Sequence, residues 1–175
     1  MRTSKQGMVY VIEDDASVRR ALERLLKSAN LAVRTFTSAA EFLQAGCPTE
    51  NACVVADVCM QGMSGLQLQR ELQQAGSPLR FIFVTAQDTE ETRAEAIRAG
   101  GAALFVKPVD DQALLDAIHW TLSLSADRPG GGSPGGWDQS PTTKVPLEAC
   151  RSAIFFSEVE PSPSHHHPDK ETWTC

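Results

Sequence analysis

Four short apolar segments of this chain each end at a polar side chain. They lie in MVYVIEDD, ACVVAD, RFIFVT and ALFVK and end at Asp14, Asp57, Thr85 and Lys107. Segments this short, rich in β-branched and aromatic residues, indicate strands that are buried on both faces of a parallel sheet. Because ligands of such sheets bind beyond the carboxyl ends of the strands, we expect the four polar side chains at one edge.

Helical patterns separate these strands. The first helix is expected to begin near Ala16, with apolar residues on one side and charged residues on the other. The apolar stripe is Val18, Leu22, Leu25 and Leu26, and the charged side is Arg19, Arg20, Glu23 and Arg24. The segment AVRTF, which precedes the next helix signal, is expected to be the remaining strand.

Short polar residues mark the expected starts of the later helices. Ser38 and Glu41 have the spacing of a capping box, and Ser64, Asp88 and Asp110 are expected to cap three further helices. Gly76 and Gly100 are expected to end two of them. Five alternating strand and helix units predict an α/β fold with a doubly wound, five-stranded parallel sheet.

The chemistry expected at the sheet edge follows from these residue types. Carboxylates bind hard divalent cations, whereas a lysine ammonium and a threonine hydroxyl neutralise or hydrogen-bond phosphate oxygens. The sequence therefore predicts a site that handles phosphoryl groups.

The segments VIEDDASVRRAL, DVCMQGMSG, VTA and KP, in this order and at these spacings, resemble the receiver domain of two-component response regulators, in particular its FixJ-like branch. The resemblance covers roughly residues 8 to 123. It implies the flavodoxin-like strand order 2-1-3-4-5, in which Asp14 and Asp57 flank the crevice where the chain reverses direction.

The resemblance also implies a role for each site residue. Asp57 would be the phosphoacceptor for a sensor histidine kinase or phosphotransfer protein. Glu13, Asp14, Asp57 and the backbone carbonyl of Cys59 would hold Mg²⁺, with Glu13 acting through water. Lys107 would supply a second positive charge, and the Lys107–Pro108 peptide bond would be cis.

The same family transmits its signal through a threonine and a residue on the last strand. Here these are Thr85 and Leu104, where relatives have an aromatic residue in place of Leu104. We expect the Thr85 hydroxyl to bond the phosphoryl group and Leu104 to repack, which would permit phosphorylation-dependent homodimerisation. The chain would be no enzyme beyond catalysing its own phosphorylation and dephosphorylation.

Two other functions are alternatives to this one. A Mg²⁺-dependent phosphatase of the haloacid-dehalogenase type needs a second aspartate two residues after its nucleophile, and Cys59 stands there. A receiver that sequesters phosphoryl groups or acts as an adaptor, without transcriptional output, is the nearer alternative. The non-functional interpretation of Asp57 is an aspartate that ends a strand as a loop cap.

Composition separates residues 8–125, the expected receiver domain, from residues 126–175. The latter hold seven of the ten prolines and are expected to be a disordered Pro/Gly/Ser-rich tail, apart from a short apolar segment at 149–159. They show no helix-turn-helix pattern, so we expect the family's DNA-binding output domain to be missing.

The net charge of −6 argues against direct nucleic-acid binding, because acidic residues outnumber basic ones on both sides of position 125. No apolar run approaches the ~20 residues that span a bilayer, and the N-terminus lacks a signal-peptide core. The chain is therefore expected to be cytoplasmic.

Overall fold

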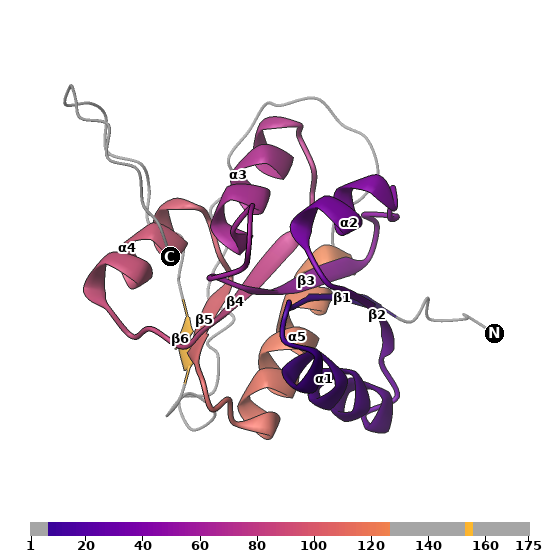
Figure 1. Ribbon diagram of the computed structural model, residues 1–175. Helices are drawn as coiled ribbons and strands as arrows, with labels where there is room; N and C mark the ends of the chain where they lie inside the picture. The colour runs from indigo at the N-terminus through magenta and orange to yellow at the C-terminus, as the bar shows by residue number, and fades with distance from the viewer. Residues whose placement is uncertain (1–6, 127–152, 156–175) are drawn as a thin grey trace, which may run out of the picture.

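The computed structural model describes residues 7–126 and 153–155, which build a twisted sheet covered by helices on both faces (Figure 1). Five parallel strands run in the order β2-β1-β3-β4-β5, which is the order that the resemblance to receiver domains implies. A short sixth strand, β6, adds to β5 in the antiparallel direction. The strands are β1 Met8–Ile12, β2 Ala32–Phe36, β3 Ala52–Asp57, β4 Arg80–Thr85, β5 Ala103–Val106 and β6 Ala153–Phe155.

Within the described residues, five helices cover the sheet. They are α1 Ala16–Ser28, α2 Ala39–Gln44, α3 Gly65–Gln74, α4 Glu90–Arg98 and α5 Asp111–Ala126. Helices α1 and α5 pack on one face, and α2, α3 and the end of α4 pack on the other (Figure 1). This arrangement is the doubly wound fold expected from the five strand and helix units.

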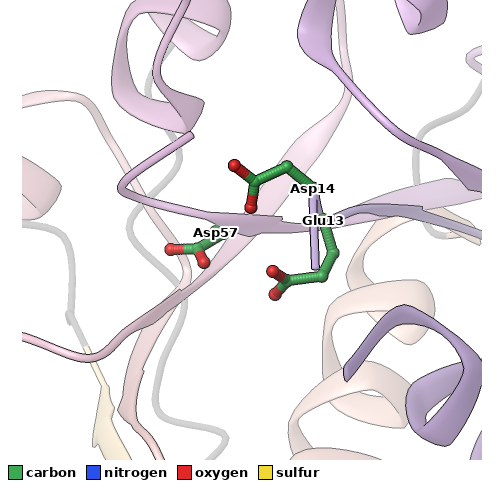
Figure 2. A group of neighbouring side chains, drawn as sticks. All are labelled: Glu13, Asp14 and Asp57. Carbon is green, nitrogen blue, oxygen red and sulfur yellow. The ribbon is translucent and has the colours of Figure 1, made fainter. Parts of the chain in front are cut away.

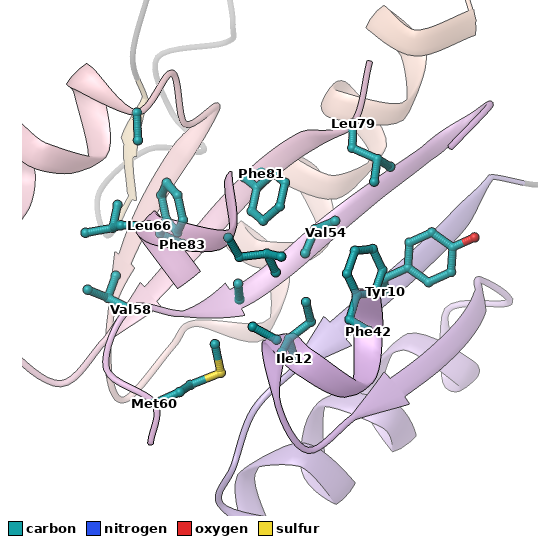
Figure 3. Packing of buried hydrophobic residues seen from close by; sticks show 14 of the residues in the cluster. Tyr10, Ile12, Phe42, Val54, Val58, Met60, Leu66, Leu79, Phe81 and Phe83 are labelled. Atoms are coloured by element: carbon teal, nitrogen blue, oxygen red, sulfur yellow. The ribbon is translucent and has the colours of Figure 1, made fainter. Parts of the chain in front are cut away.

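The core divides into two clusters, one on each face of the sheet. Along β1, Val9 and Val11 face the α1/α5 side, whereas Tyr10 and Ile12 face the α2/α3 side (Figure 3). This alternation is the period of two that strand geometry requires. Both faces are apolar, so the strands read as continuous hydrophobic segments.

Helix caps set where the connecting loops end. The Asp15 carboxylate accepts hydrogen bonds from the N–H groups of Ser17 and Val18. Ser64 and Gln67 form a reciprocal capping box at the start of α3, and Asp110 accepts from the N–H of Ala113 near the start of α5. Each satisfies amides that a helix start leaves unpaired.

Two predicted caps differ in detail. Thr89, not Asp88, caps α4, because the Asp88 carboxylate is held by Arg93 through a hydrogen bond of 2.7 Å. At α2, Ser38 caps as predicted, but the Glu41 carboxylate bonds the N–H and hydroxyl of Thr37 instead of completing a capping box. The start of α4 is therefore one residue later than predicted, whereas α2 starts where predicted but with a different partner for Glu41.

Residues 126–175, expected to form a disordered tail, fall mainly outside the described residues. Only Ala126, at the end of α5, and β6 belong to the described part of the chain. In that part, no helix combines the length and apolar character required to cross a membrane.

Candidate functional site

The carboxyl ends of β1, β3, β4 and β5 bring the predicted site residues to one edge of the sheet. The register pairs Ile12 with Ala56, so Glu13 and Asp57 follow at the same level on neighbouring strands. Asp57 in turn pairs with Val84, the residue before Thr85. Strand register alone therefore gathers side chains that lie far apart in the sequence.

Three carboxylates face one another at this edge (Figure 2). One oxygen from each of Glu13, Asp14 and Asp57 lies within 4.8 Å of the other two. Glu13 and Asp57 are buried, whereas Asp14 is exposed. The cluster is thus open to solvent on the side of Asp14 and closed on the side of Glu13.

Lys107 enters the cluster from the residue after β5. Its Nζ lies 2.6 Å from Asp57 Oδ2 and 2.9 Å from Glu13 Oε2. Burial alone would lower the pKa of Lys107, but hydrogen bonds to the two carboxylates and their charges raise it above its usual value. Lys107 therefore stays a cation, and the Lys107–Pro108 bond that follows it is cis.

The surroundings of Glu13 raise the pKa of its carboxyl group above the usual value. Burial raises its pKa, and the nearby charge of Asp57 adds to that effect, although the hydrogen bond from Lys107 opposes it. The N–H of Asp15 also donates to Glu13 Oε1 at 3.2 Å. Three carboxylates against one ammonium leave excess negative charge, which a bound cation would neutralise.

The β3–α3 loop folds back over the acidic cluster. The N–H of Cys59 donates to Asp57 Oδ1 at 2.9 Å, and the N–H of Gln61 approaches Asp14 Oδ2 at 3.4 Å. Helix α3 begins against this loop at Gly65, where a Cβ atom would clash with the carbonyl oxygen of Asp57. A glycine is therefore required for α3 to pack this close to the Asp57 backbone.

Thr85 and Leu104 lie on the face of the sheet that carries α3 and α4. The Thr85 side chain is fully buried, and its hydroxyl donates to the carbonyl of Gln87 and accepts from the N–H of Gln87. Leu104 is 1% exposed, so it already occupies an inward position. In this state Thr85 is engaged by its own loop rather than by Asp57.

Arg19 is a site residue that the sequence reasoning missed. It was placed on the charged, outer side of the first helix, but it is half-buried and its Nη1 donates to the backbone carbonyls of Glu13 at 2.7 Å and Asp14 at 3.2 Å. The available signal was position: Arg19 lies one helical turn after the acidic residues, on the turn of α1 that borders their loop.

Residues 9–119 match the response regulator receiver domain family, and the chain belongs to that family. Among curated proteins it is 42% identical over 126 residues to the transcriptional regulatory protein TdiR of Thauera aromatica, covering 72% of this chain and 56% of TdiR. It is also 42% identical over 120 residues to FixJ of Azorhizobium caulinodans, covering 69% of this chain and 57% of FixJ. The chain thus spans little more than half the length of these relatives.

Solved structures of response regulators have a similar fold. The response regulator StyR is 39% identical, with a TM-score of 0.65, and covers 70% of this chain and 62% of StyR. The FixJ-N crystal structure is 28% identical, with a TM-score of 0.64, and the match covers 68% of this chain and 95% of FixJ-N. The predicted family and fold are therefore confirmed, and the chain carries the receiver domain of a two-component response regulator.

Proposed function

We propose that this receiver domain accepts a phosphoryl group on Asp57 from a histidine kinase or phosphotransfer protein. The observation that carries the proposal is the Asp57 carboxylate itself, buried, bonded by Lys107 and grouped with Glu13 and Asp14. A carboxylate in this setting is a nucleophile next to the positive charge that a phosphoryl group needs.

In the reaction, an Asp57 oxygen forms a bond to phosphorus as the bond from phosphorus to the donor's histidine nitrogen breaks. The electron pair of that bond stays with the imidazole, which returns to its neutral form after taking up a proton. Lys107 Nζ is hydrogen-bonded to Asp57 Oδ2, and from that position it would bond the oxygens of the transferred phosphoryl group. The N–H of Cys59 holds the other carboxylate oxygen and so fixes the carboxylate plane.

The acidic cluster fits Mg²⁺ by its donor set. Its ligands are hard carboxylate oxygens, one exposed to solvent at Asp14, and Mg²⁺ prefers few carboxylates with retained waters. Asp14 and Asp57 would hold the ion directly, Glu13 through water, and the Cys59 carbonyl would complete the protein ligands. When bound, the ion would neutralise charge on the phosphoryl oxygens.

The output would pass through Thr85 to Leu104. The Thr85 hydroxyl would leave Gln87 and bond the phosphoryl group, which would repack the face made by α4, β5 and α5 and promote association of two copies. Because Leu104 is already buried, we expect the shift to be small. A cytoplasmic location and the absence of direct nucleic-acid contact by this chain belong to the same proposal.

The proposal is tested by incubating the full chain with Mg²⁺ and acetyl phosphate and measuring its intact mass. We expect one phosphoryl addition, none in Asp57→Asn, and full labelling in the matched control Asp15→Asn. Asparagine caps helices as well as aspartate does, so the control keeps α1 intact while removing one acid from the same loop. Labelling of Asp57→Asn to the wild-type extent would refute the assignment.

A further inference from the structure

The outer edge of β5 is the feature that the phosphorylation chemistry does not use. β5 pairs with β4 on one side and with β6 on the other (Figure 1). In the register of the second pair, Ala153, Ile154 and Phe155 lie opposite Phe105, Leu104 and Ala103. β6 is the only antiparallel strand of the sheet that the described residues form. An edge strand exposes a row of unpaired backbone groups that another strand can bond.

Backbone alternation shows which groups of β5 face outward. The N–H of Lys107, directly after β5, donates to the carbonyl of Thr85 on β4. Since alternate residues of a strand point their backbone groups the same way, Phe105 and Ala103 also face β4, and Leu104 faces the outer edge. Ala102 also bonds β4, but it lies in the bend before the strand, where this alternation does not apply.

The outward-facing residue is therefore Leu104, and its partner in the register is Ile154. In an antiparallel pair, two residues that face each other in this way exchange both of their backbone hydrogen bonds. β6 is thus hydrogen-bonded to the backbone of Leu104, the residue that is expected to change its packing on phosphorylation.

We propose that the outer edge of β5 is a strand-addition site, that its occupant is the chain's own segment Ala153–Phe155, and that this pairing keeps the α4–β5–α5 face from a second copy. The pairing stands on the backbone register alone. Its effect on self-association rests on the proposed function, because that function assigns the face its role.

The length of the chain favours an intramolecular occupant. Residues 127–152 join the end of α5 to β6, and an extended chain covers about 3.3 Å per residue. The 26 residues of this connection are therefore long enough to cross a small domain, whose diameter is about 30 Å, and can bring β6 to the β5 edge of the same chain. Main-chain hydrogen bonds supply the affinity in strand addition, so the pairing needs no special side-chain pocket.

The pairing is tested in the full chain by hydrogen exchange of the Leu104 amide, with the Val54 amide in central β3 as the internal reference for global opening. Ile154→Pro removes the donor that faces β5, whereas Ala153→Pro, the matched control, alters an N–H that faces away from it. We expect Leu104 protection to fall about tenfold or more in Ile154→Pro only, with Val54 unchanged in both. Equal Leu104 protection in the three proteins would overturn the pairing.

Two further measurements decide the occupant and the consequence. Leu104 protection that does not change with protein concentration supports the intramolecular strand, and protection that grows with concentration would assign the edge to a second copy. With beryllofluoride and Mg²⁺, sedimentation should show stronger self-association of Ile154→Pro than of wild type or Ala153→Pro. The labelling of Asp57 tests the proposed function separately, so identical sedimentation of three proteins that are all labelled would overturn the blocking role alone. Exchange at Leu104 needs no phosphoryl mimic, and the test of the pairing is therefore independent of the proposed function.

Discussion

At the residue scale, Lys107 has two opposing effects on the site. Its ammonium bonds Asp57 Oδ2 and Glu13 Oε2, two of the carboxylates expected to hold or orient the metal ion. It would therefore compete electrostatically with a bound cation before phosphoryl transfer. During phosphoryl transfer, however, it would add positive charge where the phosphoryl oxygens arrive.

Lys107→Ala should separate these two effects. We expect Mg²⁺ to bind several-fold more tightly, because a competing positive charge is lost, and labelling by acetyl phosphate at saturating Mg²⁺ to slow by about 10²-fold. Titration calorimetry gives the affinity and time-resolved intact mass gives the rate. Lys27→Ala, which removes an exposed lysine paired with Glu23, is the control. Weaker Mg²⁺ binding with an unchanged rate would contradict the role given to Lys107.

Arg19 should act as a positioning residue for the acidic loop. Its two hydrogen bonds fix the carbonyls of Glu13 and Asp14 and thereby orient both side chains. Arg19→Ala should raise the Mg²⁺ dissociation constant about tenfold, since a hydrogen bond from a charged donor contributes about 1.5 kcal/mol or more. Arg20→Ala removes the same charge from the next residue, whose guanidinium bonds only within α1 in the described structure, and should leave the affinity unchanged. Equal affinities of the two variants would show that Arg19 does not position the loop.

The sequence placed Asp57, Thr85 and Lys107 at one edge of the sheet because each stands at the carboxyl end of an apolar strand, either as its last residue or directly after it. The contact of Arg19 with the acidic loop was not predicted, because helical periodicity divides residues only into an inner and an outer side. A long side chain on the outer side can still reach back over the preceding loop, and periodicity carries no information on that reach.

At the scale of the element, local capping chemistry explains where α3 begins after the β3–α3 loop. Ser64→Ala should lower the free energy of unfolding by about 1 kcal/mol, because it removes the side-chain acceptor for the N–H of Gln67. Urea denaturation measures the change. Ser123→Ala, at an exposed position of α5 whose hydroxyl bonds the Trp120 carbonyl, should cost little or nothing. A loss as large in Ser123→Ala as in Ser64→Ala would mean that capping is not the cause.

The elements were predictable to different degrees. The five parallel strands and five helices could be predicted from the sequence, because apolar segments, amphipathic stripes and capping residues are all local signals. The choice of Thr89 over Asp88 as the cap of α4 depended on the Arg93 side chain, which competes for the Asp88 carboxylate. The short apolar segment containing β6 could be foreseen, but its partner could not, because pairing with β5 depends on contacts distant in sequence.

At the scale of the whole molecule, the fold gathers acidic groups at a cost in repulsion that a cation relieves. The full chain should therefore be stabilised by Mg²⁺. At ten times its dissociation constant the ion should add about 1.4 kcal/mol, which corresponds to a few degrees in Tm. Differential scanning fluorimetry at constant ionic strength measures the shift. Asp14→Asn should abolish most of it, and a shift of wild-type size in that variant would remove Asp14 from the proposed ligands.

The most direct test of the account is to locate the phosphoryl group. The chain, labelled with acetyl phosphate and Mg²⁺, would be treated with borohydride, which reduces an aspartyl phosphate to homoserine, and then mapped by peptide mass spectrometry. If Asp57 is the phosphoacceptor, homoserine appears at position 57 and aspartate stays at positions 14 and 15. Homoserine elsewhere, or an unmodified Asp57 in a chain that carries phosphate, would contradict this assignment.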